Sequence, residues 1–189
     1  IDMDVILAIA AEAEDGSGIR KEQEQVREKY PCKIAVAMDE AFCFYYEDNL
    51  RLLEEYGAVL QYFSPLHEKS LPKDCDGILL GGGYPELYVE ELSRNHSMRK
   101  AVREAFEDGM PTVAECGGFL YLHTVLNDQK NQAYEMAGVL NGTCQDMGRL
   151  VRFGYIELEE KCSNFLPEHT KIRAHEFHYF DSSDNGSDC

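Results

Sequence analysis

A single cysteine stands between an apolar run and two glycines, in the stretch Val113-Ala114-Glu115-Cys116-Gly117-Gly118-Phe119-Leu120-Tyr121-Leu122. An apolar strand that ends in a nucleophile on a sharp turn, followed by an apolar helix, is typical of α/β hydrolytic enzymes. Gly117 and Gly118 suit the backbone of such a turn. The unpaired N–H groups and dipole of the following helix favour thiolate over thiol. The pattern predicts that Cys116 is an exposed, activated nucleophile, although a buried cysteine is often an inert small hydrophobe.

A glycine triplet lies in Leu80-Gly81-Gly82-Gly83-Tyr84-Pro85-Glu86, directly after another apolar run. In an open α/β sheet this position is the carboxyl edge, where ligands bind. Backbone N–H groups of Gly82 and Gly83, together with the N–H of Gly117, could form an oxyanion hole. The triplet fits neither G-x-x-x-x-G-K-[ST] nor G-x-G-x-x-G, so it is not a phosphate loop. A plain turn is the alternative.

A third stretch, His175-Glu176-Phe177-His178, adds titratable side chains near the end of the chain. If 173–180 is a strand, Glu176 and His178 point to one face and His175 points to the other.

The elements that hold these residues follow an alternating pattern. Apolar runs of strand length at 34–37, 59–62, 77–80 and 112–114 are separated by segments of helix length. Two of these segments, 44–56 and 98–107, carry apolar residues near helical spacing. The alternation predicts a mostly parallel sheet flanked by helices. After residue 122 the pattern changes to strands joined by turns, at 136–140, 149–158 and 173–180.

The composition of the chain indicates its class of protein and excludes some kinds of partner. The chain has 189 residues, 44% of them hydrophobic, which suits one folded domain. Its formal net charge of -17 would repel nucleic acid and anionic membrane surfaces. Seven cysteines without a C-x-x-C pair favour a reducing, cytoplasmic location. No segment has the length and polarity pattern of a membrane span or a signal peptide.

Three parts are expected along the chain: residues 1–30 as a linker or tail, 31–180 as the folded domain, and 181–189 as a polar tail. Within 1–30, a short apolar piece is followed by a charged run from Glu12 to Lys29, which is typical of a solvated linker or surface helix.

Three motifs together resemble a known family. They are Gly-Gly-Gly-Tyr-Pro-Glu at 81–86, Ala-Glu-Cys-Gly-Gly-Phe-Leu-Tyr-Leu at 114–122 and His-Glu-Phe-His-Tyr at 175–179. They are similar to the glutaminase domain of cobyrinic acid a,c-diamide synthases, which are class I glutamine amidotransferases with a flavodoxin-like core. The resemblance covers nearly everything from residue 33 to residue 180.

The resemblance implies one half of a two-part enzyme. An N-terminal ATP-dependent synthetase domain, with ATP and Mg as cofactors, activates two carboxylates of a corrin precursor. The present domain hydrolyses glutamine and supplies the ammonia. Residues 1–30 would be the end of that synthetase domain plus a linker. No cofactor and no metal are expected in the present domain.

The resemblance also assigns roles to residues. Cys116 matches the nucleophile and His178 matches the general base, which exchanges protons during thioester formation and hydrolysis. Many class I amidotransferases carry a glutamate two residues after this histidine, where the present chain has Phe180. Glu176 is therefore the candidate for an orienting or substrate-contacting group.

Several alternatives remain at this point. The glutaminase domains of cobyric acid synthase and of nickel-sirohydrochlorin a,c-diamide synthase are close alternatives within the same enzyme class. In cobyric acid synthase the expected form of the histidine motif is Gly-Tyr-Glu-Ile-His, so His-Glu-Phe-His-Tyr at 175–179 favours the diamide synthases. A non-catalytic docking domain on the same fold is a second class. A flavin site is disfavoured, because the loop after 34–37 lacks a hydroxyl-rich phosphate cradle.

Overall fold

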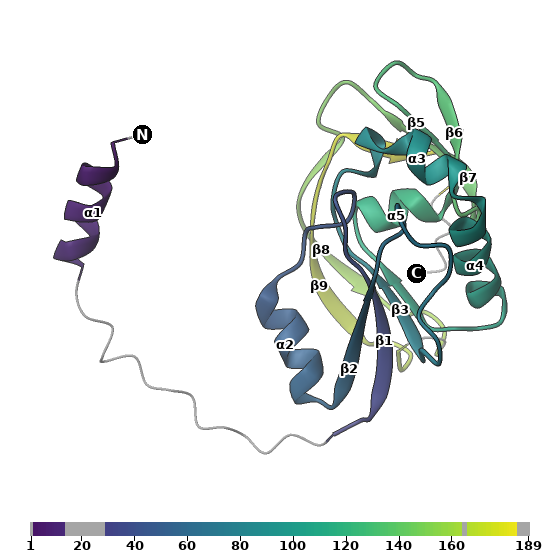
Figure 1. Cartoon of the computed structure of the whole chain (residues 1–189), viewed down its shortest axis with the longest axis horizontal. Helices are drawn as coiled ribbons and strands as arrows, with labels where there is room; N and C mark the ends of the chain where they lie inside the picture. The colour runs from purple at the N-terminus through teal and green to yellow at the C-terminus, as the bar shows by residue number, and fades with distance from the viewer. Residues whose placement is uncertain (1, 14–28, 164–165, 185–189) are drawn as a thin grey trace.

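The alternating apolar runs form a parallel sheet with the strand order β2-β1-β3-β4 (Figure 1). The computed structural model describes residues 2–13, 29–163 and 166–184. The strands of this first sheet are β1 (Cys32–Ala37), β2 (Ala58–Phe63), β3 (Gly77–Leu80) and β4 (Thr112–Ala114). All four predicted runs are therefore strands, and the predicted parallel sheet is confirmed.

Helices lie on both sides of the first sheet. They are α2 (Glu47–Glu55), the 3₁₀ turn η2 (Pro85–Leu87), α3 (Val89–Arg94), α4 (His96–Glu107) and α5 (Gly117–Leu122). In Figure 1, α2 lies on one side of the sheet and α4 on the other. The Asn95 side chain caps α4 by accepting from the Met98 N–H at 3.4 Å. Both predicted helices are confirmed with shifted ends.

The second half adds β-structure, as predicted. A second sheet has the order β10-β7-β5-β6, and β8 pairs only with β9 among the described strands. These strands are β5 (His123–Asn127), β6 (Ala133–Glu135), β7 (Leu140–Asp146), β8 (Arg152–Glu159), β9 (Lys171–His178) and β10 (Phe180–Ser182). The predicted strand at 136–140 was wrong, because residues 136–139 form the connection from β6 to β7.

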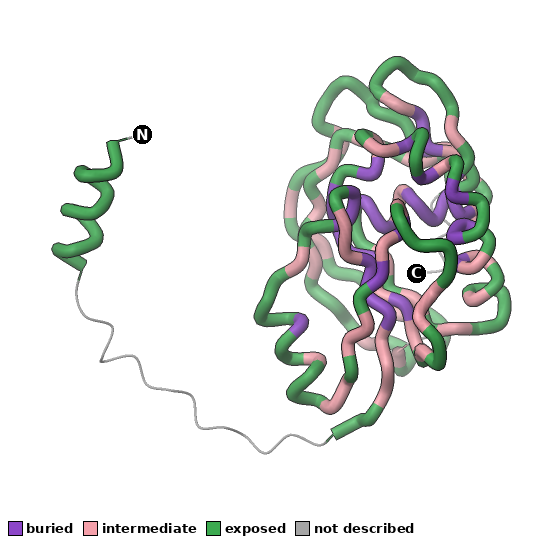
Figure 2. Tube along the Cα trace, viewed as in Figure 1, coloured by how far each residue is buried: buried purple, intermediate pink, exposed green. Residues whose placement is uncertain are grey.

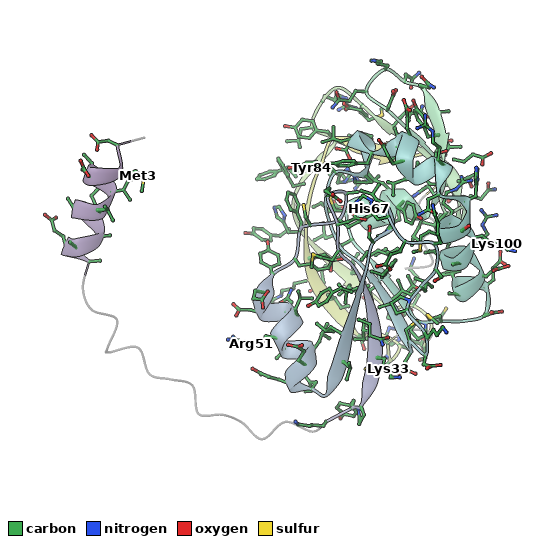
Figure 3. The ribbon with its side chains drawn as sticks, viewed as in Figure 1. Met3, Lys33, Arg51, His67, Tyr84 and Lys100 are labelled. Atoms are coloured by element: carbon green, nitrogen blue, oxygen red, sulfur yellow. The ribbon has the colours of Figure 1, made fainter. Side chains whose placement is uncertain are left out.

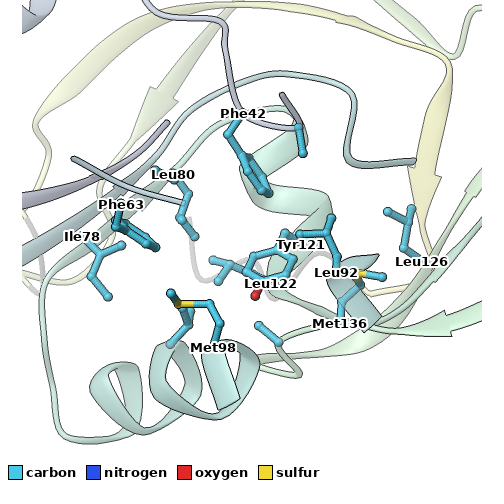
Figure 4. Packing of buried hydrophobic residues seen from close by; sticks show 14 of the residues in the cluster. Phe42, Phe63, Ile78, Leu80, Leu92, Met98, Tyr121, Leu122, Leu126 and Met136 are labelled. Atoms are coloured by element: carbon cyan, nitrogen blue, oxygen red, sulfur yellow. The ribbon is translucent and has the colours of Figure 1, made fainter. Parts of the chain in front are cut away.

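The core lies between the two sheets, α4 and α5 (Figures 2 and 4). Alternate residues of β1 and β3 face it, including Ala35, Ile78 and Leu80. Phe42 packs edge-on against Tyr121 of α5, with 5.5 Å between ring centroids. Burial of these side chains fixes α5 against the end of the first sheet. The turn at Cys116, which leads into α5, is therefore held in place by the core.

The two ends of the chain differ from the core. Helix α1 (Met3–Glu12) is capped by the Asp2 carboxylate and has no buried residue. The predicted charged run extends into residues 14–28, which lie outside the described residues. At the other end, Asp181 and Ser182 of the predicted polar tail belong to β10. Residues 185–189 lie outside the described part.

Ser182 is held by a buried histidine. The fully buried His123 contacts the Ser182 hydroxyl at 2.7 Å through Nε2 and the Phe119 carbonyl at 2.8 Å through Nδ1. Its role is structural, and it ties β10 to the end of α5.

No helix in the described part of the chain has the length and apolar character required to span a membrane.

Candidate active site

Cys116 is held in an unusual backbone conformation at the end of β4. Its φ is 49° and its ψ is -110°, in a region that residues with a β-carbon rarely adopt. The sequence indicated that the glycines would take the strained positions, and this was wrong, because Gly117 and Gly118 begin α5. They are required for space instead. A Cβ on Gly118 would lie 2.2 Å from the Leu80 carbonyl oxygen.

The cysteine turn is bonded to the glycine triplet. The Glu115 N–H donates to the Leu80 carbonyl at 2.9 Å, and the Gly118 N–H donates to the Gly81 carbonyl at 3.0 Å. A Cβ on Gly117 would lie 3.1 Å from the Gly83 nitrogen. The two glycine-rich segments, far apart in sequence, therefore form one surface around the sulfur.

Two backbone donors of this surface face the thiol. The backbone N–H groups of Gly117 and Gly83 act on the Cys116 sulfur by lowering the pKa of the thiol. Gly82 contributes space: a Cβ there would be 3.6 Å from the Cys116 Cβ and 3.2 Å from the Phe44 Cβ. Donors in these positions can stabilise negative charge on sulfur or on an oxygen bound beside it.

The triplet itself is positioned by the loop after β1. The Asp39 carboxylate accepts from the Ala41 N–H at 2.9 Å and from the Ser64 hydroxyl at 2.8 Å. The Ala41 carbonyl in turn accepts from the Tyr84 N–H at 3.0 Å. The Asp39 carboxylate caps this loop by accepting from its backbone N–H groups. It thereby supports the position of the triplet.

The aromatic run at 42–46 divides between core and surface. Phe42 is fully buried, whereas Phe44 is 53% exposed and packs edge-on against Tyr84, which lies at the surface (Figure 3). The Tyr45 hydroxyl accepts from the Gly81 N–H at 2.8 Å and donates to the Ala37 carbonyl. Burial raises the pKa of Tyr45 to about 12, so this hydroxyl keeps its proton.

The thiol of Cys116 is less acidic than the sequence predicted. Desolvation by the surrounding protein raises its pKa above the ordinary value, and the nearby Glu86 and Glu115 carboxylates raise it further. The Gly117 and Gly83 N–H groups oppose this shift without reversing it. The residue still has contact with solvent. The predicted accessibility is confirmed, and the predicted activation was wrong in direction, because burial and two carboxylates outweigh the backbone donors.

His178 lies near the end of β9 with one ring nitrogen engaged. Its Nδ1 is 2.6 Å from the Phe180 carbonyl oxygen. A neutral imidazole that donates from Nδ1 leaves Nε2 as an acceptor. Within the described residues, no hydrogen bond joins His178 to Cys116 or to Glu176. His178 and Glu176 are both half-buried and lie on the same face of β9, as the sequence predicts.

Two features near the site could not be found from sequence patterns. Glu86 is half-buried on η2, and burial together with the charge of Asp146 raises the pKa of its carboxyl. The bond from His178 goes to a backbone carbonyl, which no side-chain motif encodes. The Pro85 ring, which a Cβ on Gly117 would meet at 2.8 Å, places η2 against α5.

An apolar groove of about 570 Å³ lies between α2 and the first sheet. Its walls include Ile34, Leu79, Val113 and Glu115. Cys116 is not among its lining residues, although the neighbouring Glu115 is. Among the described residues, no group of three or more His, Cys, Asp or Glu side chains could hold a metal ion.

Comparisons with known proteins place this geometry in a family. Residues 33–188 match the CobB/CobQ-like glutamine amidotransferase domain. The chain is 42% identical to a cobyrinate a,c-diamide synthase from Caldanaerobacter subterraneus subsp. tengcongensis, over 95% of this chain and 39% of that protein. For proteins of the same name the identity is 48% in Clostridium tetani, over 77% of this chain and 33% of that protein. The identity is 41% to the protein of this name from Salmonella typhimurium, over 96% of this chain and 39% of that protein.

A solved structure supports the fold. The structure of PurLQS from Thermotoga maritima matches with a TM-score of 0.54 at 19% identity, covering 80% of this chain and 68% of that chain. This likeness shows the fold alone. The present chain spans between 33% and 39% of the length of the three synthases named above. On its sequence and its fold, the chain belongs to the CobB/CobQ-like glutamine amidotransferase domain family.

Proposed function

We propose that this domain hydrolyses glutamine at Cys116 and supplies the ammonia for amidation of the a and c carboxylates of cobyrinic acid by a longer protein. The observation that carries the proposal is the Cys116 turn. Cys116 has a positive φ and follows β4 at the carboxyl edge of a parallel sheet, where the backbone N–H groups of Gly83 and Gly117 lower the pKa of its thiol. The names of the relatives supply the corrin substrate.

The reaction begins with attack of the Cys116 sulfur on the carboxamide carbon of glutamine. The carbonyl π electrons move to oxygen, and the Gly83 and Gly117 N–H groups stabilise the resulting oxyanion. The bond from carbon to nitrogen then breaks, the nitrogen receives a proton, and ammonia leaves behind a glutamyl thioester. Water attacks the thioester, which releases glutamate and restores the thiol.

His178 is the proposed base and acid in these steps. Because the Cys116 pKa is raised, the thiol is mostly protonated at neutral pH and has to lose its proton to a base. The bond from Nδ1 to the Phe180 carbonyl leaves Nε2 free to accept that proton. The imidazolium then gives this proton to the leaving nitrogen. The neutral imidazole later accepts a proton from the attacking water and returns it to the Cys116 sulfur as the thioester breaks.

Gly82 and Glu176 support the same site. Gly82 keeps the space beside Cys116 open, because a side chain at position 82 would contact both the Cys116 and the Phe44 side chains. The Glu176 carboxylate shares the half-buried face of β9 with His178. Since Phe180 already orients the imidazole, Glu176 is better suited to contact the substrate than to hold the base.

The second half of the reaction belongs to a partner domain. An ATP-dependent synthetase domain of the same polypeptide would bind ATP and Mg and activate the corrin carboxylates, and ammonia would pass to it from Cys116. Residues 1–30 would form its end and the linker. The reducing cytoplasm is the proposed compartment, because all six cysteines within the described residues are free thiols.

The test is labelling with 6-diazo-5-oxo-norleucine, a glutamine analogue with an electrophilic carbon. Peptide mass spectrometry should find the adduct on Cys116 among the seven cysteines, and labelling should be lost in His178→Ala. Cys116→Ala should abolish glutamine hydrolysis and leave the circular dichroism spectrum unchanged. Retained hydrolysis in Cys116→Ala would overturn the proposal and favour a non-catalytic docking domain.

A further inference from the structure

The β8–β9 hairpin has two chemically different faces. Antiparallel pairing places Arg152 opposite His178 and Gly154 opposite Glu176 on the face that carries the proposed base. The intervening residues point the other way. This second face, here termed the aromatic face, consists of Phe153, Tyr155, His175, Phe177 and Tyr179.

The rings of the aromatic face form a continuous ladder. Phe153 packs edge-on against His175 and Phe177, with 5.8 Å between centroids in each pair. Tyr155 packs against His175 at 5.3 Å, and Phe177 packs against Tyr179 at 5.9 Å. The ladder is exposed: Tyr155 is 91% accessible and Phe153 is 71% accessible. A contiguous exposed apolar patch marks an interaction site on a monomeric protein.

Charged residues continue the ladder toward the far end of the hairpin. Glu157 lies opposite Arg173 in the strand register, and the Lys171 ammonium is 2.7 Å from the Glu157 carboxylate. An aromatic centre bordered by paired charges is the composition of a protein–protein interface.

Few backbone bonds attach the hairpin to the rest of the domain. β8 and β9 pair with no other strand in the described part of the chain. The Val151 N–H donates to the His178 carbonyl at 2.9 Å, and the Met147 N–H donates to the Tyr179 carbonyl at 3.0 Å, where the hairpin joins β7. A partner bound to the aromatic face would therefore contact β9, the strand that carries His178. The His178 ring makes no hydrogen bond to Cys116 among the described residues.

The charge of the chain restricts which kind of partner can bind the aromatic face. A net charge of -17 disfavours nucleic acid, and it disfavours a second copy of the chain because two such copies repel each other. The synthases that this chain resembles are more than twice as long, since the match covers 39% of two of them. A domain outside the match is therefore available as a neighbour.

We infer that the aromatic face is the surface on which the ATP-dependent synthetase domain docks, and that docking moves the hairpin so that His178 engages Cys116. This inference rests on the proposed function. It couples glutamine hydrolysis to the presence of the domain that consumes the ammonia, because docking brings the base and the nucleophile together more often than in the isolated chain.

The test joins this chain, in place of the matching part, to the remainder of the Caldanaerobacter synthase. Amidation of cobyrinic acid is measured with glutamine and separately with ammonium chloride. The test variant is Phe153→Ser/Tyr155→Ser. The control is Tyr62→Ser on β2, where the aromatic side chain is 52% exposed and lies outside the aromatic face. Thermal unfolding of both variants checks that they fold.

We expect the double variant to lose at least about tenfold in glutamine-driven amidation, as for removal of interface anchors. Ammonium-driven amidation should stay unchanged, as should both activities of Tyr62→Ser. Labelling of Cys116 by 6-diazo-5-oxo-norleucine should be faster in the joined protein than in the isolated chain, and the double variant should abolish that difference. Equal glutamine-driven rates in the double variant and the control would overturn the inference.

Two further measurements keep the proposals apart. Amide hydrogen exchange should show protection of β8 and β9 in the joined protein relative to the isolated chain, whether or not glutamine is hydrolysed. Absence of Cys116 labelling in every form would remove the proposed function while leaving docking measurable. Sedimentation that finds a dimer of the isolated chain, which the double variant dissociates, would assign the aromatic face to a second copy instead.

Discussion

The Nδ1 atom of His178 lies 2.6 Å from the backbone carbonyl oxygen of Phe180. A carbonyl accepts only from a protonated nitrogen, so this contact fixes the tautomer that presents a lone pair on Nε2. In a Cys–His–carboxylate triad, a charged side chain has that role. Here an uncharged backbone atom holds the ring, and it adds no negative charge to those of Glu86 and Glu115, both of which raise the pKa of the Cys116 thiol.

Glu176 is therefore expected to act on substrate binding more than on proton transfer. Glu176→Gln should raise the KM for glutamine several-fold and change kcat by less than about threefold, because the tautomer of His178 does not depend on it. His178→Ala should lower kcat by about 10²- to 10⁴-fold. Steady-state kinetics with glutamine, recorded across pH, separates the two. A fall in kcat for Glu176→Gln as large as that for His178→Ala would make Glu176 the orienting group.

The fold was largely predictable from sequence because its strands are bounded by clear breaks. β3 and β4 begin and end where the apolar runs do, between Asp76 and Gly81 and after Pro111. β5 was missed, since His123-Thr124-Val125-Leu126-Asn127 follows α5 without any glycine or proline to signal a change of element. Its pairing with β7 is a tertiary contact that local patterns do not encode.

The site was predictable to the extent that it depends on local turns. The positions of Cys116 and the glycine triplet follow from strand ends, which sequence reveals. The acidity of the thiol does not, because it depends on burial and on Glu86, a residue that only packing of η2 against α5 brings near. A helix N-terminus alone would have given the opposite direction.

Gly118→Ala should destabilise the domain strongly. The new Cβ would lie 2.2 Å from the Leu80 carbonyl oxygen, so α5 has to move away from β3. The expected cost is about 3 kcal/mol or more, or roughly 6–12 °C in Tm for a domain of this size. Gly109→Ala is the matched control: it has open space around it and a φ of 84°, so only the backbone term of about 1 kcal/mol applies. Equal shifts in thermal unfolding would contradict the packing argument.

Asp39→Ala should loosen the loop that supports the glycine triplet. The carboxylate accepts four hydrogen bonds, including those from the Ser64 hydroxyl and the Leu66 N–H. Losing them should cost about 2–5 kcal/mol in the free energy of unfolding. Asp76→Ala, which removes one bond to the exposed Lys33 N–H, should cost about 1 kcal/mol. Urea unfolding measures both, and a smaller effect for Asp39 than for Asp76 would refute the assignment.

Glu86→Gln should make Cys116 more acidic. Removing the Glu86 charge takes away one of the groups that raise the thiol pKa, so a larger fraction of Cys116 is thiolate below the pKa. Alkylation of Cys116 by iodoacetamide between pH 7 and 8 should therefore accelerate, by less than about tenfold, because tenfold corresponds to a full pKa unit. The rate should reach its plateau at lower pH than in the unmodified chain. The control is Glu91→Gln, which removes the charge of an exposed carboxylate on α3. It should change neither the alkylation rate of Cys116 nor the pH at which that rate reaches its plateau. The rate at Cys116 is followed by peptide mass spectrometry, and a slower reaction in Glu86→Gln would mean that the carboxylate activates the thiol rather than opposing its ionisation.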